Sequence, residues 1–309
     1  MAAANLKALA RYSDSLSHVY LEHAVIEQED HSIAAFTPDG KITLPAANLS
    51  SVVLGPGTRI THAAVKVLAD CGALITWTGS EGLLFYASGQ SKTRLSQGVE
   101  LQARFWADPA LHLQVVRRMY GYRFTETLPI HLTLQQIRGK EGVRVRETYQ
   151  QLAKEYGVTW NGRRYDRNSW DDADPINKAL SAANAALYAI VLAGLHSLGY
   201  SPALGFVHTG KQLSFVYDVA DLVKTETSLP AAFEAAAEGA DKVESRARRI
   251  LRDRCCHERI QDRLTKAVPA LFAAKAEDLA QSTNNEVASL WDGKGTVSGG
   301  RLHDGGHDS

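Results

Sequence analysis

Short apolar runs separated by turn residues fill the first part of the chain and predict β-strands. Such runs cover residues 19–26, 32–36 and 42–44, and Pro38-Asp39-Gly40 between the last two predicts a hairpin. Another run closes at Leu54, and two more, 73–78 and 83–87, flank a turn at 79–82. One helix is expected among these strands, with Thr61 as its N-cap and Gly72 just past its end.

The apolar period becomes helical after residue 90. One broad helical face ends at Gly157 and is made by Leu134, Ile137, Val145, Tyr149, Leu152 and Tyr156. Asp174 and Pro175 are the cap and first residue of a long apolar helix that runs to about residue 198. Helical patterns follow over 213–224, from Pro230, and over 241–267, the last one basic and amphipathic.

The pattern predicts an α+β fold with two domains and a tail. We expect a small β-rich N-terminal domain over 1–90 and a larger all-α catalytic domain over 91–280. The tail, 281–309, is rich in Gly, Ser, Asn and Asp and is expected to be mobile. The length of 309 residues agrees with two domains, and 45% hydrophobic and 22% charged residues are typical of a globular protein rather than a disordered or fibrous one.

The composition indicates a cytoplasmic protein. The longest purely apolar run, 185–195, is too short to cross a bilayer and predicts a buried helix, and no export signal is expected from the first residues. Three cysteines are an odd number, and the adjacent pair Cys255-Cys256 is poorly placed to form a disulfide with itself. A reducing compartment is therefore expected, with no membrane partner.

Charge is balanced over the whole chain but uneven along it. The 34 basic and 34 acidic residues cancel, yet residues 91–146 hold 10 basic against 4 acidic residues and 242–266 hold 9 against 4. On charge alone, both stretches are interpreted as solvated helix faces. Phosphate binding is the alternative that the uneven distribution leaves open.

The sharpest chemical cluster lies within GFVHTGKQLSFVYDVADLVK. Asp218 and Asp221 are three residues apart, so on a helix their carboxylates would share one face, and His208 lies shortly before them. Two carboxylates with one imidazole suit Mg²⁺ or Mn²⁺. Taken alone, an Asp pair with this spacing is more often an exposed helix face, and a lone histidine such as His208 is more often a hydrogen-bonded structural residue.

Four long blocks of sequence resemble the CRISPR-associated protein one family, the spacer integrase of CRISPR adaptation, most closely its type I-E branch. The blocks are LGPGTRITHAAVK (54–66), YASGQ (86–90), QIRGKEGVRVRETYQQLAKEYGVTWNGRRYD (136–166) and GFVHTGKQLSFVYDVADLVK (205–224). The resemblance spans residues 17 to 266. It implies a β-rich N-terminal domain followed by a helical catalytic domain, in agreement with the change of period near residue 90.

The resemblance implies a catalytic metal site. Glu141, His208 and Asp221 match the family's metal ligands, and Asp218 matches the neighbouring catalytic acid. A divalent cation, Mg²⁺ or Mn²⁺, would serve attack on a phosphodiester by the 3′-OH of a DNA end. With water as the nucleophile, the same site would hydrolyse DNA.

DNA-binding residues are inferred partly from charge and partly from the resemblance. Arginines and lysines suit phosphates, and tyrosine or tryptophan can stack on unpaired bases, with core packing as the alternative for the aromatic residues. The predicted set is Arg59, Arg138, Arg146, Arg163, Arg164, Tyr165, Trp170, Tyr188, Lys211, Tyr217, Lys224, Arg248, Arg249 and Arg252.

Three positions depart from the pattern of the family. The aromatic wedge expected against a duplex end falls on His23, with Tyr20 nearby, and an expected basic position is Leu84. No proline follows Pro269, whereas some relatives end in a proline-rich tail. These departures concern DNA and partner contacts and leave the metal-site residues intact.

The main hypothesis is an integrase that inserts short foreign DNA duplexes into a CRISPR array. It would work as a homodimer on protospacer and leader-repeat duplex DNA, with CRISPR-associated protein two bridging two dimers. Two alternatives are a stand-alone nuclease for branched DNA and a DNA-binding subunit without catalysis.

Overall fold

A computed structural model describes residues 17–79, 85–89, 96–124, 126–129, 131–163, 174–272, 290–291 and 296–297. Contacts divide the chain into two compact units, one over 3–272 and another that joins 1–2 with 273–309. Within the second of these, the described residues form an antiparallel pair of short strands, β9 (Leu290–Trp291) and β10 (Thr296–Val297). All other described elements belong to the unit 3–272.

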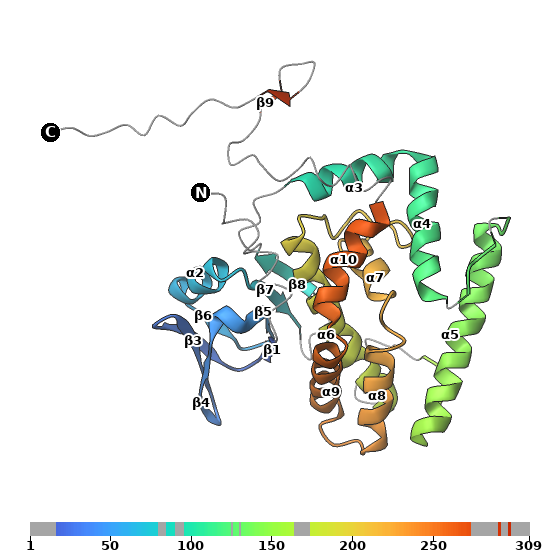
Figure 1. The fold of residues 1–309 in the computed structure, drawn as a ribbon. Helices are drawn as coiled ribbons and strands as arrows, with labels where there is room; N and C mark the ends of the chain where they lie inside the picture. Colours follow the sequence, from blue (N-terminus) through green and yellow to red (C-terminus); the bar gives the residue numbers. More distant parts are fainter. Residues whose placement is uncertain are drawn as a thin grey trace. The chain divides into compact units, whose positions relative to one another are not determined.

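Two four-stranded sheets make up the N-terminal region (Figure 1). The first has the order β1-β5-β7-β8, formed by β1 (Ser17–Leu21), β5 (Leu49–Leu54), β7 (Leu74–Thr78) and β8 (Phe85–Gly89). β1, β5 and β7 are parallel, and β8 is antiparallel to β7. The apolar runs that predict β5 and β7 are buried on both faces, as is usual for parallel strands.

The second sheet has the order β4-β3-β2-β6. It consists of β2 (Val25–Glu29), β3 (Ser32–Thr37), β4 (Gly40–Leu44) and β6 (Arg59–Ile60). The predicted hairpin joins β3 to β4 in antiparallel register. Helix α2 (His62–Asp70) contacts strands of both sheets, and the Thr61 side chain caps it by accepting from the Ala64 N–H, as predicted. Apolar residues of both sheets and α2 form one core.

The prediction of a single strand over 19–26 is wrong, because the structure divides this segment into β1 and β2, which belong to different sheets. The chain turns at His23, whose φ of 50° lies in the left-handed region. The His23 N–H donates to the Pro56 carbonyl at 2.9 Å, which holds the turn against the Gly55-Pro56-Gly57 loop. The apolar pattern alone carries no mark of this break.

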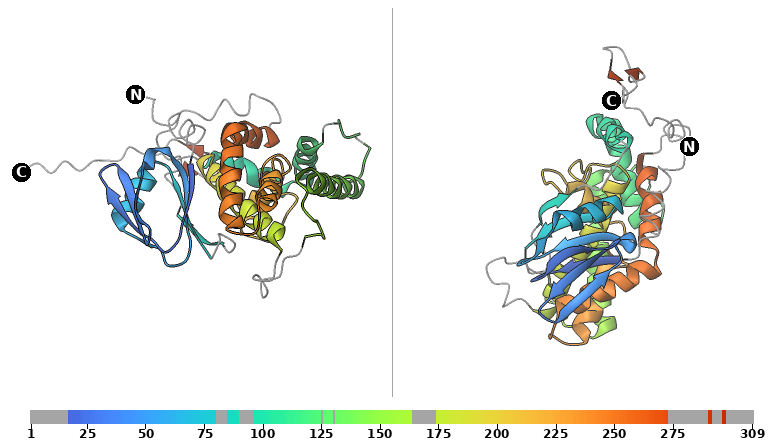
Figure 2. Two further views of the ribbon diagram at one scale, coloured as in Figure 1. Left: turned by 90° about the horizontal axis from the view of Figure 1, so that it is seen from below. Right: turned by 90° about the vertical axis from the view of Figure 1, so that its left-hand side faces the viewer.

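The remainder of the unit is helical, as predicted (Figures 1 and 2). A long helix lies at its centre, α6 (Pro175–Ser197), capped by Asp174. The described helices around it are α3 (Gln97–Ala107), α4 (Pro109–Arg123), α5 (Leu134–Tyr156), α7 (Ser214–Ala220), α8 (Ser228–Ala237), α9 (Val243–His257) and α10 (Ile260–Phe272). α5 ends at Gly157 with φ 65°, the left-handed conformation expected of a C-terminal glycine.

Helix α6 is the core of the helical region. Of the described helices it alone is long and apolar enough to span a bilayer, but 78% of its apolar window is buried inside the protein. It contacts α8 and α9 extensively and also touches β1, β5 and β7. The apolar run is therefore explained by packing, and α6 is the element that joins the helices to the first sheet.

Two predicted helix boundaries are wrong. The basic stretch 241–267 is two helices, α9 and α10, separated at Glu258 and Arg259, where Arg259 has φ 50°. The helix predicted over 213–224 is shorter in the structure and ends at Ala220. The chain then forms successive turns to residue 227. At each break, backbone hydrogen bonds span three residues instead of four, as from the Arg259 N–H to the Cys256 carbonyl. Residues 83–84 of the last predicted strand, and most of the tail, lie outside the described residues.

Candidate active site

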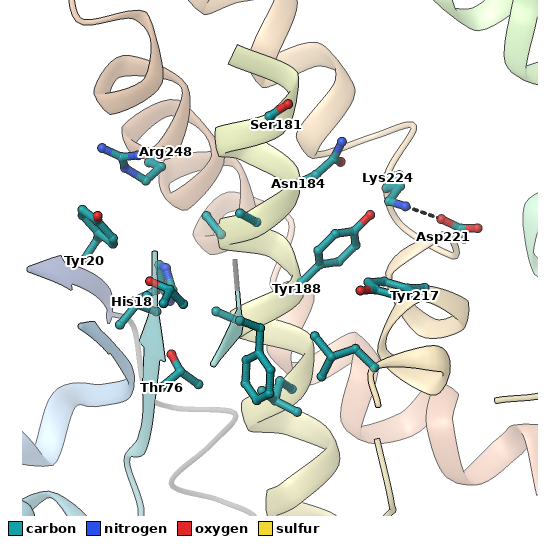
Figure 3. A pocket seen from close by; sticks show the side chains of 18 of the residues that line it. His18, Tyr20, Thr76, Ser181, Asn184, Tyr188, Tyr217, Asp221, Lys224 and Arg248 are labelled. Carbon is teal, nitrogen blue, oxygen red and sulfur yellow. Dashed lines mark hydrogen bonds and ion pairs between the residues drawn. The ribbon is translucent and has the colours of Figure 1, made fainter. Parts of the chain in front are cut away.

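A cavity of about 480 Å³ lies where the first sheet meets helices α6, α7 and α9 (Figure 3). Strands contribute His18, Tyr20 and Thr76, and helices contribute most of the remaining wall. Other polar residues that line it are Thr78, Arg163, Ser181, Asn184, Tyr188, His208, Tyr217, Asp221, Lys224 and Arg248. Two of the predicted catalytic residues, His208 and Asp221, thus border one cavity, and predicted DNA-binding residues such as Lys224 border it too.

The Asp218 carboxylate organises the loop that carries His208. It is fully buried and accepts the backbone N–H groups of Phe206, Val207 and His208 at 2.6, 3.0 and 2.9 Å. Its Oδ1 also lies 2.7 Å from Nδ1 of the His208 ring. These contacts fix the imidazole and leave Nε2 as the nitrogen that could bind a metal ion.

Close backbone packing makes this loop possible. A Cβ atom on Gly205 would lie 2.2 Å from the His208 carbonyl oxygen, so a larger residue there would force the loop open. Gly210, with φ 77°, turns the chain after His208 toward α7. Gly205 and Gly210 therefore shape the turn around the imidazole.

Asp221 has a different environment from Asp218. Its Oδ1 accepts from Nζ of Lys224 at 2.5 Å, and its Oδ2 lies 3.6 Å from Nη2 of Arg123 (Figure 3 shows the contact with Lys224). Burial alone would raise the pKa of Asp221, but the Lys224 ammonium and the Arg123 guanidinium outweigh it and hold that pKa below its usual range. Asp221 is therefore a carboxylate anion at neutral pH.

Glu141 reaches the same region from the middle of α5. Arg144, one helical turn later, donates from Nε and Nη2 to the two carboxylate oxygens at 2.8 and 2.9 Å. This bidentate contact raises the pKa of Arg144. Nη1 of Arg123 lies 3.6 Å from Glu141 Oε1, so Arg123 stands between Glu141 and Asp221.

The donor set fits a divalent cation. The carboxylates of Glu141 and Asp221 come from elements far apart in the sequence and lie on either side of the Arg123 guanidinium. Only 4% of the Arg123 side chain is exposed. His208, which borders the same cavity as Asp221, adds an imidazole nitrogen. Oxygen and nitrogen ligands of this kind suit Mg²⁺ or Mn²⁺. As they stand, no three His, Cys, Asp or Glu side chains in the described part of the chain lie close enough together to hold an ion.

Two tyrosines predicted to stack on bases form part of the cavity wall. The rings of Tyr188 and Tyr217 meet edge to face with centroids 4.9 Å apart, and Nζ of Lys224 lies 4.9 Å from the Tyr188 ring centroid (Figure 3). Both tyrosines are half-buried. Tyr188 therefore packs on its neighbours and also faces the cavity.

The opposite wall joins strand β1 to helix α9. The Arg248 guanidinium lies over the Tyr20 ring at 4.6 Å, a cation–π contact. His18 bonds to the Ser51 hydroxyl through Nδ1 at 2.7 Å. Burial, with the charge of Arg248, lowers the pKa of His18 to about 4, so this imidazole is neutral at pH 7.

The predicted DNA-binding residues other than Tyr188, Tyr217, Lys224 and Arg248 divide into three groups. Arg163 borders the cavity and turns inward, donating to Asn177 and Ser181 of α6. Arg164, Tyr165 and Trp170, together with the departure at Leu84, lie outside the described residues. The third group has exposed side chains on strand β6, helix α5, the loop before α7, and α9; its members are Arg59, Arg138, Arg146, Lys211, Arg249 and Arg252.

The residue patterns of the sequence did not identify two arginines of this site, Arg123 and Arg144. Arg144 could have been found, because a position three residues after Glu141 shares its helix face. Arg123 carries no comparable signal, since it is one of ten basic residues in the stretch 91–146 and meets the carboxylates only through the fold.

Comparison with known proteins identifies relatives along nearly the whole chain. The profile described as CRISPR associated protein Cas1 matches residues 123–234, a range that contains all four predicted catalytic residues. The CRISPR-associated endonuclease Cas1 2 of Thermus thermophilus is 48% identical over 307 residues, 98% of this chain and 94% of that protein. The CRISPR-associated endonuclease Cas1 of Escherichia coli is 44% identical over 241 residues, 78% of this chain and 79% of that protein.

Solved structures agree with the sequence relatives. The crystal structure of a TtCas1–DNA complex has a TM-score of 0.81 and 48% identity, covering 92% of this chain and 100% of that chain. A casposase bound to an integration product has a TM-score of 0.63 at 11% identity, covering 84% of this chain and 92% of that chain. The casposase is therefore similar in fold alone.

Proposed function

The chain belongs to the Cas1 family of CRISPR-associated proteins, and from this premise we propose that it is a metal-dependent DNA integrase. It would join the 3′-OH ends of short captured duplexes to phosphodiesters of a CRISPR array. The observation that carries the proposal is the convergence of Glu141 and Asp221 on one buried positive charge, beside the cavity that His208 borders. The relatives named as endonucleases support nuclease chemistry at this site.

Glu141, His208 and Asp221 would hold Mg²⁺ or Mn²⁺ in this proposal. The ion, when bound, would supply positive charge for the nucleophile, the scissile phosphate and the leaving oxygen. Asp221 is already an anion at neutral pH, because Lys224 and Arg123 lower its pKa. Asp218 would orient the imidazole by its contact with Nδ1 and would not itself touch DNA, since it is fully buried.

The cavity would receive a DNA strand end. Tyr188 and Tyr217 present aromatic surface on one wall, and Arg248 presents positive charge on the other. Stacking on aromatic rings accepts any base, whereas charge attracts the phosphates. The exposed arginines of α5 and α9 would extend the contact along the duplex. A structure of a relative described as a TtCas1–DNA complex supports DNA as the ligand.

The partners and location are also part of the proposal. We propose a homodimer bridged by CRISPR-associated protein two, acting on protospacer and leader-repeat DNA in the cytoplasm. Exposed Val25 and Phe36, which pair directly across β2 and β3, are apolar surface on the second sheet that a second copy could cover. Stand-alone cleavage of branched DNA is the second candidate, favoured by the endonuclease names of the relatives.

A strand-transfer assay tests the proposed reaction. The protein with its companion, a short duplex bearing 3′-OH ends, a supercoiled target and Mn²⁺ should give covalently joined products. Asp221→Asn should reduce joining at least about 100-fold, because it removes a ligand charge. Asp253→Asn is the matched control, since Asp253 is exposed and pairs with Arg252 on the surface of α9.

The three hypotheses give different results in this assay. Joined products that require a 3′-OH support the integrase, and cleavage of branched DNA without joining supports the nuclease. DNA binding with neither reaction would indicate a subunit without catalysis. Near wild-type joining by Asp221→Asn would contradict the site assignment.

A further inference from the structure

A buried positive charge separates the two acidic side chains of the proposed metal site. The Arg123 guanidinium lies 3.6 Å from Glu141 through Nη1 and 3.6 Å from Asp221 through Nη2. Its position at the end of α4 places the guanidinium beside the Tyr120 ring, 5.1 Å from the ring centroid. With 4% of its side chain exposed, Arg123 is held inside the protein.

Neither carboxylate depends on Arg123 for its hydrogen bonds. Glu141 accepts two bonds from Arg144, and Asp221 accepts one from Lys224. Among the described residues, Nε and Nη2 of Arg123 are buried without any hydrogen-bond partner. A buried cation with unsatisfied donors is costly, so its stabilisation comes from the electrostatic field of the two carboxylates.

Space lies beside Arg123 in a second cavity. This cavity, of about 520 Å³, is lined by Arg123 and Asp221 together with Tyr122, Thr225, Glu226 and Arg263. Asp221 borders both cavities. This cavity gives the guanidinium space to withdraw from between the carboxylates, toward Glu226, whose carboxylate also pairs with Arg263.

We propose that Arg123 competes with the divalent cation for Glu141 and Asp221. The inference rests on the proposed metal site. Arg144 and Lys224 each pair with one carboxylate, whereas the Arg123 guanidinium is the positive charge that faces both. The same charge opposes a divalent ion at the same two ligands. Metal binding is therefore coupled to movement of the Arg123 side chain toward the second cavity.

Titration of the full-length protein with Mn²⁺ tests this competition by calorimetry. Arg123→Gln should bind Mn²⁺ at least about tenfold more tightly than the unmodified protein, because one positive charge has left the site. Arg123→Lys, which keeps the charge, should stay within about threefold of the unmodified protein. Equal or weaker Mn²⁺ binding by a folded Arg123→Gln protein would overturn the proposal.

Two controls separate competition from a loss of structure. Arg117→Gln changes an arginine of the same helix that donates to the Leu132 carbonyl, and it should leave Mn²⁺ affinity unchanged. Asp221→Asn should abolish the titration. If the unmodified protein and Asp221→Asn bind Mn²⁺ alike, the proposed metal site itself is wrong. If binding needs Asp221 but Arg123→Gln does not tighten it, the role of Arg123 alone is wrong.

A second measurement uses the unmodified protein, so it does not require that the Arg123→Gln protein folds. Arg123→Lys identifies the Nε–Hε signal of Arg123 by its disappearance from the nuclear magnetic resonance spectrum. Saturation with Mg²⁺ should shift that signal in the unmodified protein and leave the signal of Arg117 in place. An Arg123 signal that does not respond to Mg²⁺ would contradict movement of the guanidinium.

Discussion

Four contacts converge on the carboxylate of Asp218 and hold the segment that carries His208. Three are backbone N–H groups and the fourth is the imidazole Nδ1. A carboxylate can accept all of them because it has only acceptor oxygens. When a carboxylate contacts a histidine that binds a metal ion, the carboxylate sets the orientation of the imidazole ring. Asp218 would have this role for His208.

Asp218→Asn should damage metal binding without direct loss of a ligand. The amide presents N–H groups to N–H donors of the loop, so some of the four contacts must break. We expect Mn²⁺ affinity and strand transfer to fall about ten- to 100-fold. The measurement is a calorimetric titration with Mn²⁺ beside circular dichroism, which should show helix content unchanged. Unaltered Mn²⁺ affinity in the variant would contradict the orienting role.

Arg248 and Arg252 of helix α9 lie in different settings although they are four residues apart. Arg248 lies over the Tyr20 ring at the cavity wall, whereas Arg252 is exposed and pairs with Asp253. The four-residue spacing still allows both side chains to reach one DNA backbone, since they lie on one side of the helix. The surface ion pair of Arg252 is weak and would yield to a phosphate.

Replacing Arg248 and Arg252 together by Ala should weaken duplex binding for every DNA sequence. Each lost phosphate contact lowers the slope of log affinity against log salt by roughly 0.9, so the double variant should lose about 2 from that slope. Fluorescence anisotropy over a salt series measures it. Arg254→Ala is the control on the same helix, because Arg254 donates to Tyr156 and Glu234 within the protein. An unchanged slope in the double variant would make this face a solvated surface only.

Elements with strong local signals could be predicted from the sequence. Thr61, Asp174 and Gly157 mark helix ends in the structure as they do in the sequence, because capping depends on local hydrogen bonds. Breaks at His23 and Arg259 could not be predicted, since neither residue type favours a positive φ strongly enough. At His23, a contact with distant backbone, the Pro56 carbonyl, determines the turn.

At the scale of the whole unit, α6 brings the first sheet and the helices together around one cavity. That assembly places His18 and Tyr20 beside residues more than 150 positions later in the chain, such as Tyr188. The acidic and histidine members of the site could be predicted from the family resemblance, because their motifs are local. Arg123 could not, because its meeting with Glu141 and Asp221 depends on how three separate segments pack.

In the proposed function, Glu141, His208 and Asp221 act as one divalent-cation site. The most direct test is a crystal of the protein grown with Mn²⁺, measured for anomalous scattering by manganese. We expect an anomalous peak bonded to side chains of all three residues, with the Arg123 guanidinium displaced from between the carboxylates. A manganese peak that none of these residues contacts, or no peak at saturating Mn²⁺, would show that these residues do not form the metal site.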